Sequence, residues 1–302
     1  MTVEDITHVC NTAEELWENL NPLNEQNYPE TSKYIFRGQA DSKWELKPSI
    51  FRNIPETNIE KQASRQLFYE WNLLKNFIEF CDSIGLPIPN DSYEFRNQYF
   101  DETKTYFPQT VIKNQSLFMN DNLLELIALA QHSEVPTRLL DWSYDSYVAA
   151  FFAASGVFNS KDNKLTHFAI WAFDTIGAYD KEKLKVITLP YAYNPNMRSQ
   201  KGCFTYWEQD LVRGKEISIK NMEEIKGLPL KKFEVPISEA KKILNFCDIH
   251  GINHATIFPN YEGAGKASVF KANQDRKIHL GIDENEINRD GEKKSMVYFL
   301  GK

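Results

Sequence analysis

Hydrophobic residues follow two spacings along the chain, one helical and one alternating, and their distribution predicts the secondary structure. Between residues 59 and 84, apolar side chains recur every three or four positions, so Leu67, Trp71 and Leu74 share one face of a long helix. Further helices are predicted from Thr12 to about Leu20 and at residues 92–107, 121–130, 147–158 and 238–250. Strands are predicted at residues 34–38, 167–173, 184–189, 233–237, 252–258 and 295–300.

The order of these elements predicts the fold class. Helices dominate the first half of the chain and strands the second, which is typical of an α+β protein. The sequence has no internal repeat and no low-complexity linker between the halves, so we expect one integrated domain over residues 30–270. Residues 1–29 form an N-terminal extension with a short helix, and residues 271–302 form a C-terminal extension that completes the fold.

Polar residues and glycines mark several of the predicted helix ends. Thr12 and Glu15 have the spacing of a capping box, and Asp121 is expected to cap the helix that follows it. Gly251 is expected to end the helix over residues 238–250, because glycine adopts the left-handed conformation of a helix terminus at little cost.

Composition limits the classes of partner. The 302 residues include 35 Lys and Arg against 42 Asp and Glu, which gives a net charge of −7. This balance argues against a broad nucleic-acid-binding surface and against binding to anionic lipid, although it is compatible with a local basic groove. Hydrophobic residues make up 42% of the chain, enough for a substantial core.

The lack of a recognisable targeting signal and the spacing of the cysteines predict a soluble, cytoplasmic protein without a membrane partner. The N-terminus lacks the basic region and apolar run of a secretory signal, and the apolar run over residues 147–158 is too short to cross a bilayer. The four cysteines lie far apart and form no Cys-x-x-Cys pair, so we expect isolated reduced thiols.

Arg37 stands at the end of a predicted strand and is followed by Gly38. A planar guanidinium beside backbone that a ligand can approach closely suits the recognition of phosphate or carboxylate. The alternative is an arginine that pairs with a carboxylate of the core. The sequence around Arg37 is compatible with both interpretations.

A second polar segment, residues 131–142, lies between two apolar helices. Residues this polar beside buried segments must form hydrogen bonds with each other or with a ligand. His132 is a candidate base or ribose contact, or alternatively a histidine that interacts with the helix dipole. Arg138 and Asp141 are candidate ligand-binding residues, or alternatively a structural ion pair.

Two later segments add polar side chains to the candidates. Arg198 and Gln200 lie in a polar segment that contains glycine, and Glu262 is presented by a Pro/Gly turn after a predicted strand. His250 and His254 are four residues apart, but the helix end between them spoils the geometry of a metal site, so no metal is predicted. The sequence contains no Walker loop, no Gly-x-Gly-x-x-Gly and no Gly-x-Ser-x-Gly motif.

Taken together, these segments resemble one family, the FRG domain. The resemblance is carried by Phe36-Arg37-Gly38-Gln39 with Trp44, residues 48–52, Gln131-His132, residues 136–142, the small-residue aromatic helix after them, the spacing of Arg198 and Gln200, and the turn at Glu262. It covers about residues 30–270 and implies a protein of bacteria or phages, in a family often encoded near conflict and defence genes. Ser133 and Asn260 depart from the family pattern, in which glycine and an acid are usual.

The aromatic-Arg-Gly strand end also resembles the first motif of ADP-ribosyltransferases, in which that arginine grips the phosphate of NAD. This resemblance implies an NAD-consuming transferase, a toxin or antiphage effector, that needs no metal or other cofactor and takes NAD as its substrate. Arg37 would position the diphosphate, while Glu262 would bind ribose and stabilise an oxocarbenium-like state. The polar motif in mid-chain would lie around Thr137 or Gln200.

The resemblances and the local patterns give one set of candidate residues. The catalytic candidates are Arg37, His132 and Glu262, and the ligand-binding candidates are Gly38, Gln39, Trp44, Thr137, Arg138, Asp141, Trp142, Arg198 and Gln200. The two tryptophans are included because an indole ring can stack on nicotinamide or adenine. The expected partners are a nucleotide or NAD-like small molecule and a macromolecular acceptor that the sequence does not identify.

Two other functions fit the same residues. One is a metal-independent enzyme that processes nucleotides or nucleic acid with His132 and Asp141 as acid and base. The other is a non-catalytic module in which Arg37 and Arg138 grip an anionic ligand.

Overall fold

The computed structural model of the chain describes most of its length. It covers residues 6–52, 63–101, 118–162, 164–177, 183–190, 195–208, 221–225 and 227–280, with the backbone alone from residue 273. The chain divides into two compact units, Met1–Asn253 and His254–Lys302, which are described separately below.

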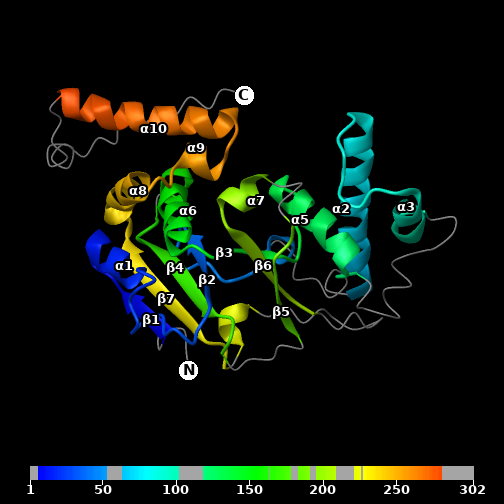
Figure 1. Ribbon diagram of the computed structural model, residues 1–302, viewed down its shortest axis with the longest axis horizontal. Coiled ribbons are helices and arrows are strands. Elements are labelled where there is room, and N and C mark those ends of the chain that lie inside the picture. The colour runs from blue at the N-terminus through cyan, green and yellow to red at the C-terminus, as the bar shows by residue number, and fades with distance from the viewer. Residues whose placement is uncertain are drawn as a thin grey trace. The chain divides into compact units, whose positions relative to one another are not determined.

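A seven-stranded mixed sheet forms the centre of the described part of the first unit (Figure 1). Its strands are β1 (Thr7–Val9), β2 (Tyr34–Gln39), β3 (Leu140–Ser143), β4 (His167–Asp174), β5 (Leu184–Ile187), β6 (Gly202–Trp207) and β7 (Leu230–Pro236). They are arranged in the order β1-β7-β4-β2-β3-β6-β5, with β1 parallel to β7 and every other pair antiparallel. The presence of this sheet together with the helices confirms the α+β prediction.

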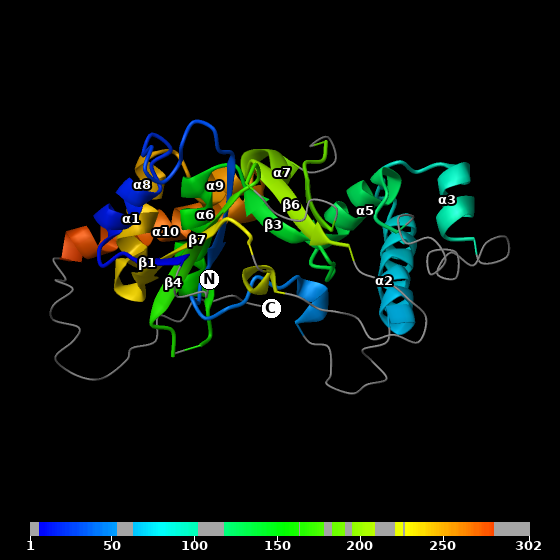
Figure 2. The same ribbon diagram turned by 90° about the horizontal axis from the view of Figure 1, so that it is seen from below.

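The helices of the first unit gather at both ends of the sheet and over its middle. They are α1 (Ala13–Asn19), α2 (Ala63–Ser83), α3 (Tyr93–Tyr99), α5 (Asp121–His132), α6 (Ser146–Asn159), α7 (Pro195–Ser199) and α8 (Ala240–Ile249), with short 3-10 turns η2 (Ser49–Phe51), η4 (Met222–Glu224) and η5 (Ile237–Glu239). Figures 1 and 2 agree that α1 and α8 lie beside β1 and β7, whereas α5, α2 and α3 extend beyond β6 at the other end.

Helix α6 packs closely on β2 because small residues line the contact. Ala149 and Ala153 are buried on the face of α6 that meets β2, and Gly38 lies directly beneath them. A Cβ atom at Gly38 would overlap the carbonyl oxygen of Ala149 and lie 2.6 Å from the backbone nitrogen of Ala153. Since side chains alternate along a strand, Phe36 and Gly38 face α6 while Arg37 leaves the opposite face of β2.

Two hydrophobic clusters stabilise the first unit, one between helices and sheet and one on the sheet itself. One joins α2 and α5 to β6 through residues that include Trp71, Ile127 and Phe204. The other packs Trp142 and Trp171 on the sheet beneath the segment that follows β2. Burial of large aromatic side chains supplies much of the free energy that holds each region together.

The long periodic helices are confirmed, with small changes at their ends. Helix α2 lies inside the range predicted as residues 59–84, and α6 coincides closely with the helix predicted at residues 147–158. Helix α5 begins where predicted, but its N-cap is Asn120, whose side chain accepts from Asn122 and Leu123; the prediction of Asp121 as the cap is wrong. At α1, Thr12 accepts from the backbone of Glu15 as predicted.

Short elements account for most of the differences. Strands β1, β3 and β6 were not predicted, since each is short or begins in a segment rich in polar residues. Strands β1 and β3 lie in the first half of the chain, so the predicted separation into helix-rich and strand-rich halves is not found in the described residues. The strand predicted at residues 295–300 and the later part of the helix predicted at residues 92–107 lie outside the described residues.

The second unit is helical where the structure describes it, so the strand predicted at residues 252–258 is wrong. This segment forms α9 (His254–Ile257), which is followed by α10 (Tyr261–Leu280). The side chain of Asn260 accepts from the backbone of Gly263 and caps α10, and Gly263 allows the close approach of the Phe258 carbonyl. Its few apolar residues, interspersed with polar ones, fit either a strand or a helix, and no described strand pairs with this segment.

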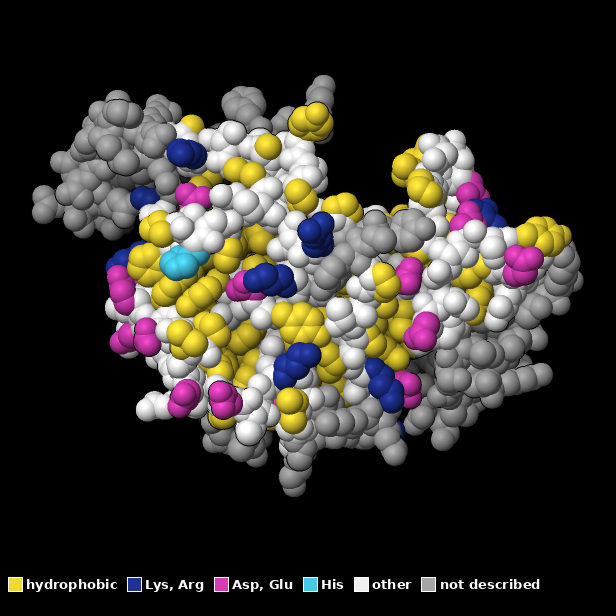
Figure 3. Space-filling view, in the orientation of Figure 1, with side chains coloured by type: hydrophobic (Ala, Val, Ile, Leu, Met, Phe, Trp, Pro, Cys, Tyr) yellow, Lys and Arg dark blue, Asp and Glu magenta, His cyan; other side chains and the backbone are white. Residues whose placement is uncertain are grey.

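The surface of the described residues has mixed character. On the face drawn in Figure 3, Lys and Arg side chains stand singly among Asp, Glu and hydrophobic side chains. No helix in the described ranges combines the length and the apolar character needed to cross a bilayer. The domain boundaries at residues 30 and 270 remain a prediction.

The packing of α6 on β2 predicts a large loss of stability in Gly38→Ala. The new methyl group would overlap the backbone of α6, which cannot move aside without separating helix and strand. We expect the free energy of unfolding to fall by roughly 3 kcal/mol or more, as in overpacked cores, when measured by urea denaturation.

Gly202→Ala is the matched control, since Gly202 lies in β6 of the same sheet and its nearest contact to an added Cβ atom is 3.5 Å. It should leave stability unchanged or slightly higher. An equal loss in both variants would show that the close contact at Gly38 is not the cause.

Candidate functional site

The pairing between β2 and β3 is limited to one residue pair, and Arg37 lies where it ends. Phe36 pairs with Ser143, whereas β2 and β4 pair over six residues. Just beyond this pair, Arg37 Nη1 donates to the carbonyl oxygen of Asp141 at 2.7 Å. A side chain therefore supplies the donor for a strand carbonyl at this point of the sheet.

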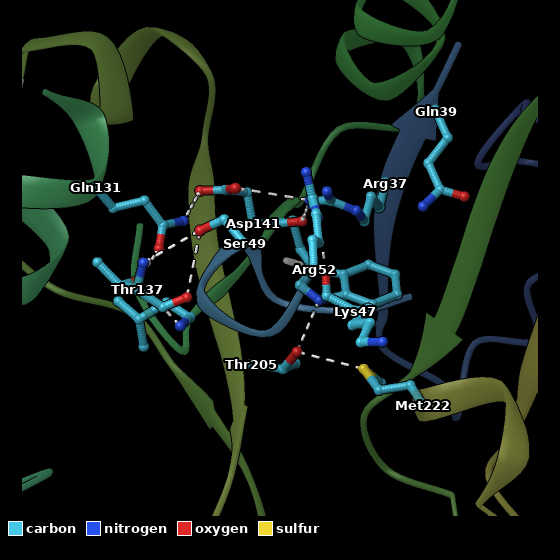
Figure 4. Close-up of polar contacts among 12 residues, drawn as sticks. Arg37, Gln39, Lys47, Ser49, Arg52, Gln131, Thr137, Asp141, Thr205 and Met222 are labelled. Carbon is cyan, nitrogen blue, oxygen red and sulfur yellow. Dashed lines mark hydrogen bonds and ion pairs between the residues drawn. The ribbon is translucent and has the colours of Figure 1, made fainter. Parts of the chain in front are cut away.

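Asp141 joins Arg37 to α5. Its carboxylate oxygen Oδ2 lies 3.6 Å from Arg37 Nη1, and its Oδ1 accepts from Gln131 Nε2 at 2.5 Å. Figure 4 shows Asp141 between the two side chains, with Arg37 extending from β2 on one side and Gln131 on the other. The Asp141 side chain is 53% exposed and that of Arg37 only 14%, so the carboxylate is the open edge of this group.

Thr137 fixes the orientation of Gln131. Its hydroxyl accepts from the backbone N–H of Leu139 and donates to the Gln131 side-chain oxygen, which leaves the Gln131 NH₂ group to face Asp141. The backbone of Thr137 exchanges hydrogen bonds with the Ser49 hydroxyl, at 3.1 and 3.3 Å. The segment after β2 is thereby tied to the segment before β3.

Two buried nitrogen atoms in this region have no hydrogen-bond partner among the described residues. They are Nε of Arg37 and Nε2 of His132, and the Tyr28 hydroxyl is the third such side-chain atom in the described chain. Buried polar atoms are almost always paired, with protein, water or ligand. His132 packs edge-on against Phe204, the residue that pairs with Asp141 across β3 and β6.

Electrostatic effects at the site follow from burial and from an excess of positive charge. Burial lowers the pKa of Arg37, the Asp141 carboxylate raises it, and the charge of Arg52 lowers it further. Burial likewise lowers the pKa of His132, against the opposing effect of Asp141. Arg52 is exposed and donates to the Lys47 carbonyl at 3.0 Å (Figure 4). Two guanidinium groups thus act near one carboxylate, which favours an added anion.

Arg138 points away from this group and forms a buried ion pair with Glu70 of α2. The guanidinium Nε and Nη2 donate to the two Glu70 oxygens at 2.7 and 2.8 Å, and Gln66 donates to the same carboxylate. Both partners of the ion pair are almost fully buried. The alternative that paired Arg138 with Asp141 is therefore wrong, because the partner of Arg138 is Glu70.

Three of the ligand-binding candidates have structural contacts. Trp142 is 4% exposed, and its indole N–H donates to Thr205 at 2.9 Å. Gln39 is also buried; it accepts from the Trp171 indole and donates to a loop carbonyl. Gly38 lies under α6. Trp44, in the segment after β2, is 51% exposed.

The remaining candidates lie outside the group around Arg37. Arg198 is exposed at the end of α7, and the backbone carbonyl of Gln200 accepts from Ser143 at 2.7 Å. Glu262 belongs to the second unit, where it pairs with Lys266 at 2.6 Å. The hydrogen bond and charge of Lys266 lower the pKa of the Glu262 carboxyl.

Small cavities lie near the site but do not include Arg37 or Asp141 among their described residues. One is bordered by Thr137, Arg138 and Glu70 and is otherwise largely apolar.

Gln131, Ser49 and Arg52 belong to the site although they were not among the candidates. All three occur within the segments that resembled a family, so their position was a usable signal. Glu70 had a different signal, because an acid on the apolar face of α2 requires a buried partner.

One protein family model matches the part of the chain that holds this group. The FRG domain model matches residues 32–162, a little under half of the chain. The chain contains an FRG domain. The matched stretch includes the group around Arg37, whereas Arg198, Gln200 and Glu262 follow it. Comparisons with curated proteins and with solved structures gave no match.

The Arg138–Glu70 pair predicts that Glu70→Gln destabilises the FRG domain. Loss of the carboxylate leaves a buried guanidinium without its counter-charge, which costs about 3–5 kcal/mol. Urea denaturation monitored by circular dichroism measures this change. Glu79→Gln on the same helix removes an exposed pair with Lys75 and should cost less than about 0.5 kcal/mol. Equal effects would contradict the structural role of Glu70.

The buried His132 predicts a pH-dependent stability. Because its pKa is lower in the folded state than in the unfolded chain, the unfolded chain binds the proton first as the pH falls below about 6.5. The folded protein therefore loses stability on acidification, and His132→Gln should lose less than the wild type between about pH 7.5 and pH 5. Denaturation at each pH gives the two slopes. The control is His8→Gln, since His8 is exposed on β1, and it should keep the wild-type slope.

Proposed function

We propose that the group around Arg37 binds a nucleotide of the NAD type and that the protein consumes NAD as an ADP-ribosyltransferase-like enzyme. The observation that carries this proposal is the pair of unpartnered buried nitrogens, on Arg37 and His132, beside a half-exposed carboxylate. An arrangement of this kind suits a ligand that brings both negative charge and hydroxyl groups.

Each part of an NAD molecule has a candidate partner in this proposal. Arg37 and Arg52 would hold the diphosphate, because two guanidinium groups near one carboxylate leave a net positive charge. Asp141 and Gln131 would bind ribose hydroxyls, and Trp44 offers an exposed ring on which a base can stack. Glu262 lies in the second unit, where it pairs with Lys266, and this proposal assigns it no contact with NAD. The acceptor of the ADP-ribosyl group is a macromolecule or water.

An effector role belongs to the same proposal. An enzyme that consumes NAD removes a metabolite on which the whole cell depends, which suits a toxin or an antiphage defence protein. A second candidate function is favoured by His132, whose buried ring lies close enough to Asp141 for their charges to interact. In that case the pair would act as base and acid on another nucleotide or on nucleic acid.

The proposal predicts that the full chain binds NAD and releases nicotinamide, and that Arg37→Ala weakens both. Loss of a charge-assisted hydrogen bond costs about 1.5–3 kcal/mol, so we expect NAD affinity to fall roughly 10- to 150-fold. Isothermal titration calorimetry measures the affinity, and chromatography measures the nicotinamide released.

Arg65→Ala is the matched control, because Arg65 is exposed on α2, away from the group around Arg37, and should leave both quantities unchanged. A wild-type protein that neither binds nor consumes NAD would contradict the proposal. Cleavage of labelled RNA or DNA that is lost in His132→Ala would support the second function instead.

A further inference from the structure

One carboxylate of the first unit is both open to solvent and held firmly in place. Asp141 Oδ1 accepts from Gln131 Nε2 at 2.5 Å, and Oδ2 lies 3.6 Å from Arg37 Nη1. The Asp141 backbone is paired with Phe204 in β6, so the side chain projects from a strand rather than a loop. A carboxylate fixed in this way is preorganised to face a developing positive charge.

The amide that orients this carboxylate is itself fixed. Thr137 directs its hydroxyl proton to Gln131, so the Gln131 NH₂ group can only donate toward Asp141. Gln131 is therefore a positioning residue. Supporting hydrogen bonds of this kind reduce the reorganisation needed when charge develops on a substrate.

Glu262, the late glutamate of the enzyme class, has different surroundings. It lies on α10, four residues before Lys266, and forms an ion pair with that lysine at 2.6 Å. Such an i,i+4 pair is typical of a solvated helix face. Its side chain is 73% exposed, and its printed partner is an exposed lysine side chain rather than a buried group.

We infer that Asp141 is the catalytic carboxylate of the FRG domain in this chain, an inference that rests on the proposed consumption of NAD. The bond between ribose C1′ and the pyridinium nitrogen of NAD breaks, and its electron pair leaves with the nitrogen as neutral nicotinamide. The positive charge that remains on C1′ and the ring oxygen is stabilised by the Asp141 carboxylate. Water adds to C1′ and releases one proton to solvent, which yields ADP-ribose.

The test compares Asp141→Asn with Glu262→Gln in the full chain. Asp141→Asn keeps the shape and the acceptor for Gln131 but removes the charge. We expect it to bind NAD within about threefold of the wild type and to release nicotinamide about 10²–10³-fold more slowly. Glu262→Gln should keep turnover within about threefold. The control Asp121→Asn changes an exposed carboxylate at the start of α5 and should change neither quantity.

Each outcome distinguishes the inference from the proposed function. If wild type consumes NAD and Asp141→Asn retains its turnover, the inference is overturned while the proposed function stands. If wild type neither binds nor consumes NAD, both are overturned. Melting curves report whether each variant folds. If Asp141→Asn does not, Asp141→Glu takes its place, since moving the carboxylate by one methylene should cost about 10²-fold in turnover, and unchanged turnover would overturn the inference.

Discussion

The hydrogen bond from Arg37 to the Asp141 carbonyl is the contact on which the organisation of this site depends. Where β2 and β3 stop pairing, the backbone carbonyl of Asp141 needs a donor, and the guanidinium supplies it at 2.7 Å. The Asp141 carboxylate also lies near the guanidinium and balances part of the charge on Arg37. Because Gln131 of α5 holds that carboxylate and Thr137, in the segment after α5, orients Gln131, segments about 100 residues apart in sequence form one group.

The sequence predicted those features that depend on local pattern. Helix α2 is visible as helical periodicity because it buries one side, whereas α6 is visible as a continuous apolar run because most of its residues are buried. Strand β3 has four residues, too few to establish an alternating pattern. The segment that forms α9 has the same limitation, since four residues are too few to distinguish a helical spacing from an alternating one.

Missing β3 also affected the choice of site residues. Once residues 140–143 are known to form a strand, alternation places Leu140 and Trp142 on one face and Asp141 on the other. Trp142 is then a core residue and Asp141 an exposed one, which sequence spacing alone does not distinguish. The partner of Arg138 is likewise non-local, because Glu70 lies 68 residues earlier in the chain.

The polar residues from Thr137 to Trp142 therefore fall into two groups, those with buried structural contacts and one that is open to solvent. The Arg138 guanidinium pairs with Glu70, and the Trp142 indole N–H donates to Thr205. These buried contacts stabilise the domain. Thr137 is used in orienting Gln131. Asp141 alone among these four residues has a side chain that is more than half exposed. Because chemistry on a ligand requires access, Asp141 is the residue of this segment to which we assign the proposed reactive role, and its neighbours explain why that carboxylate can be both exposed and rigid.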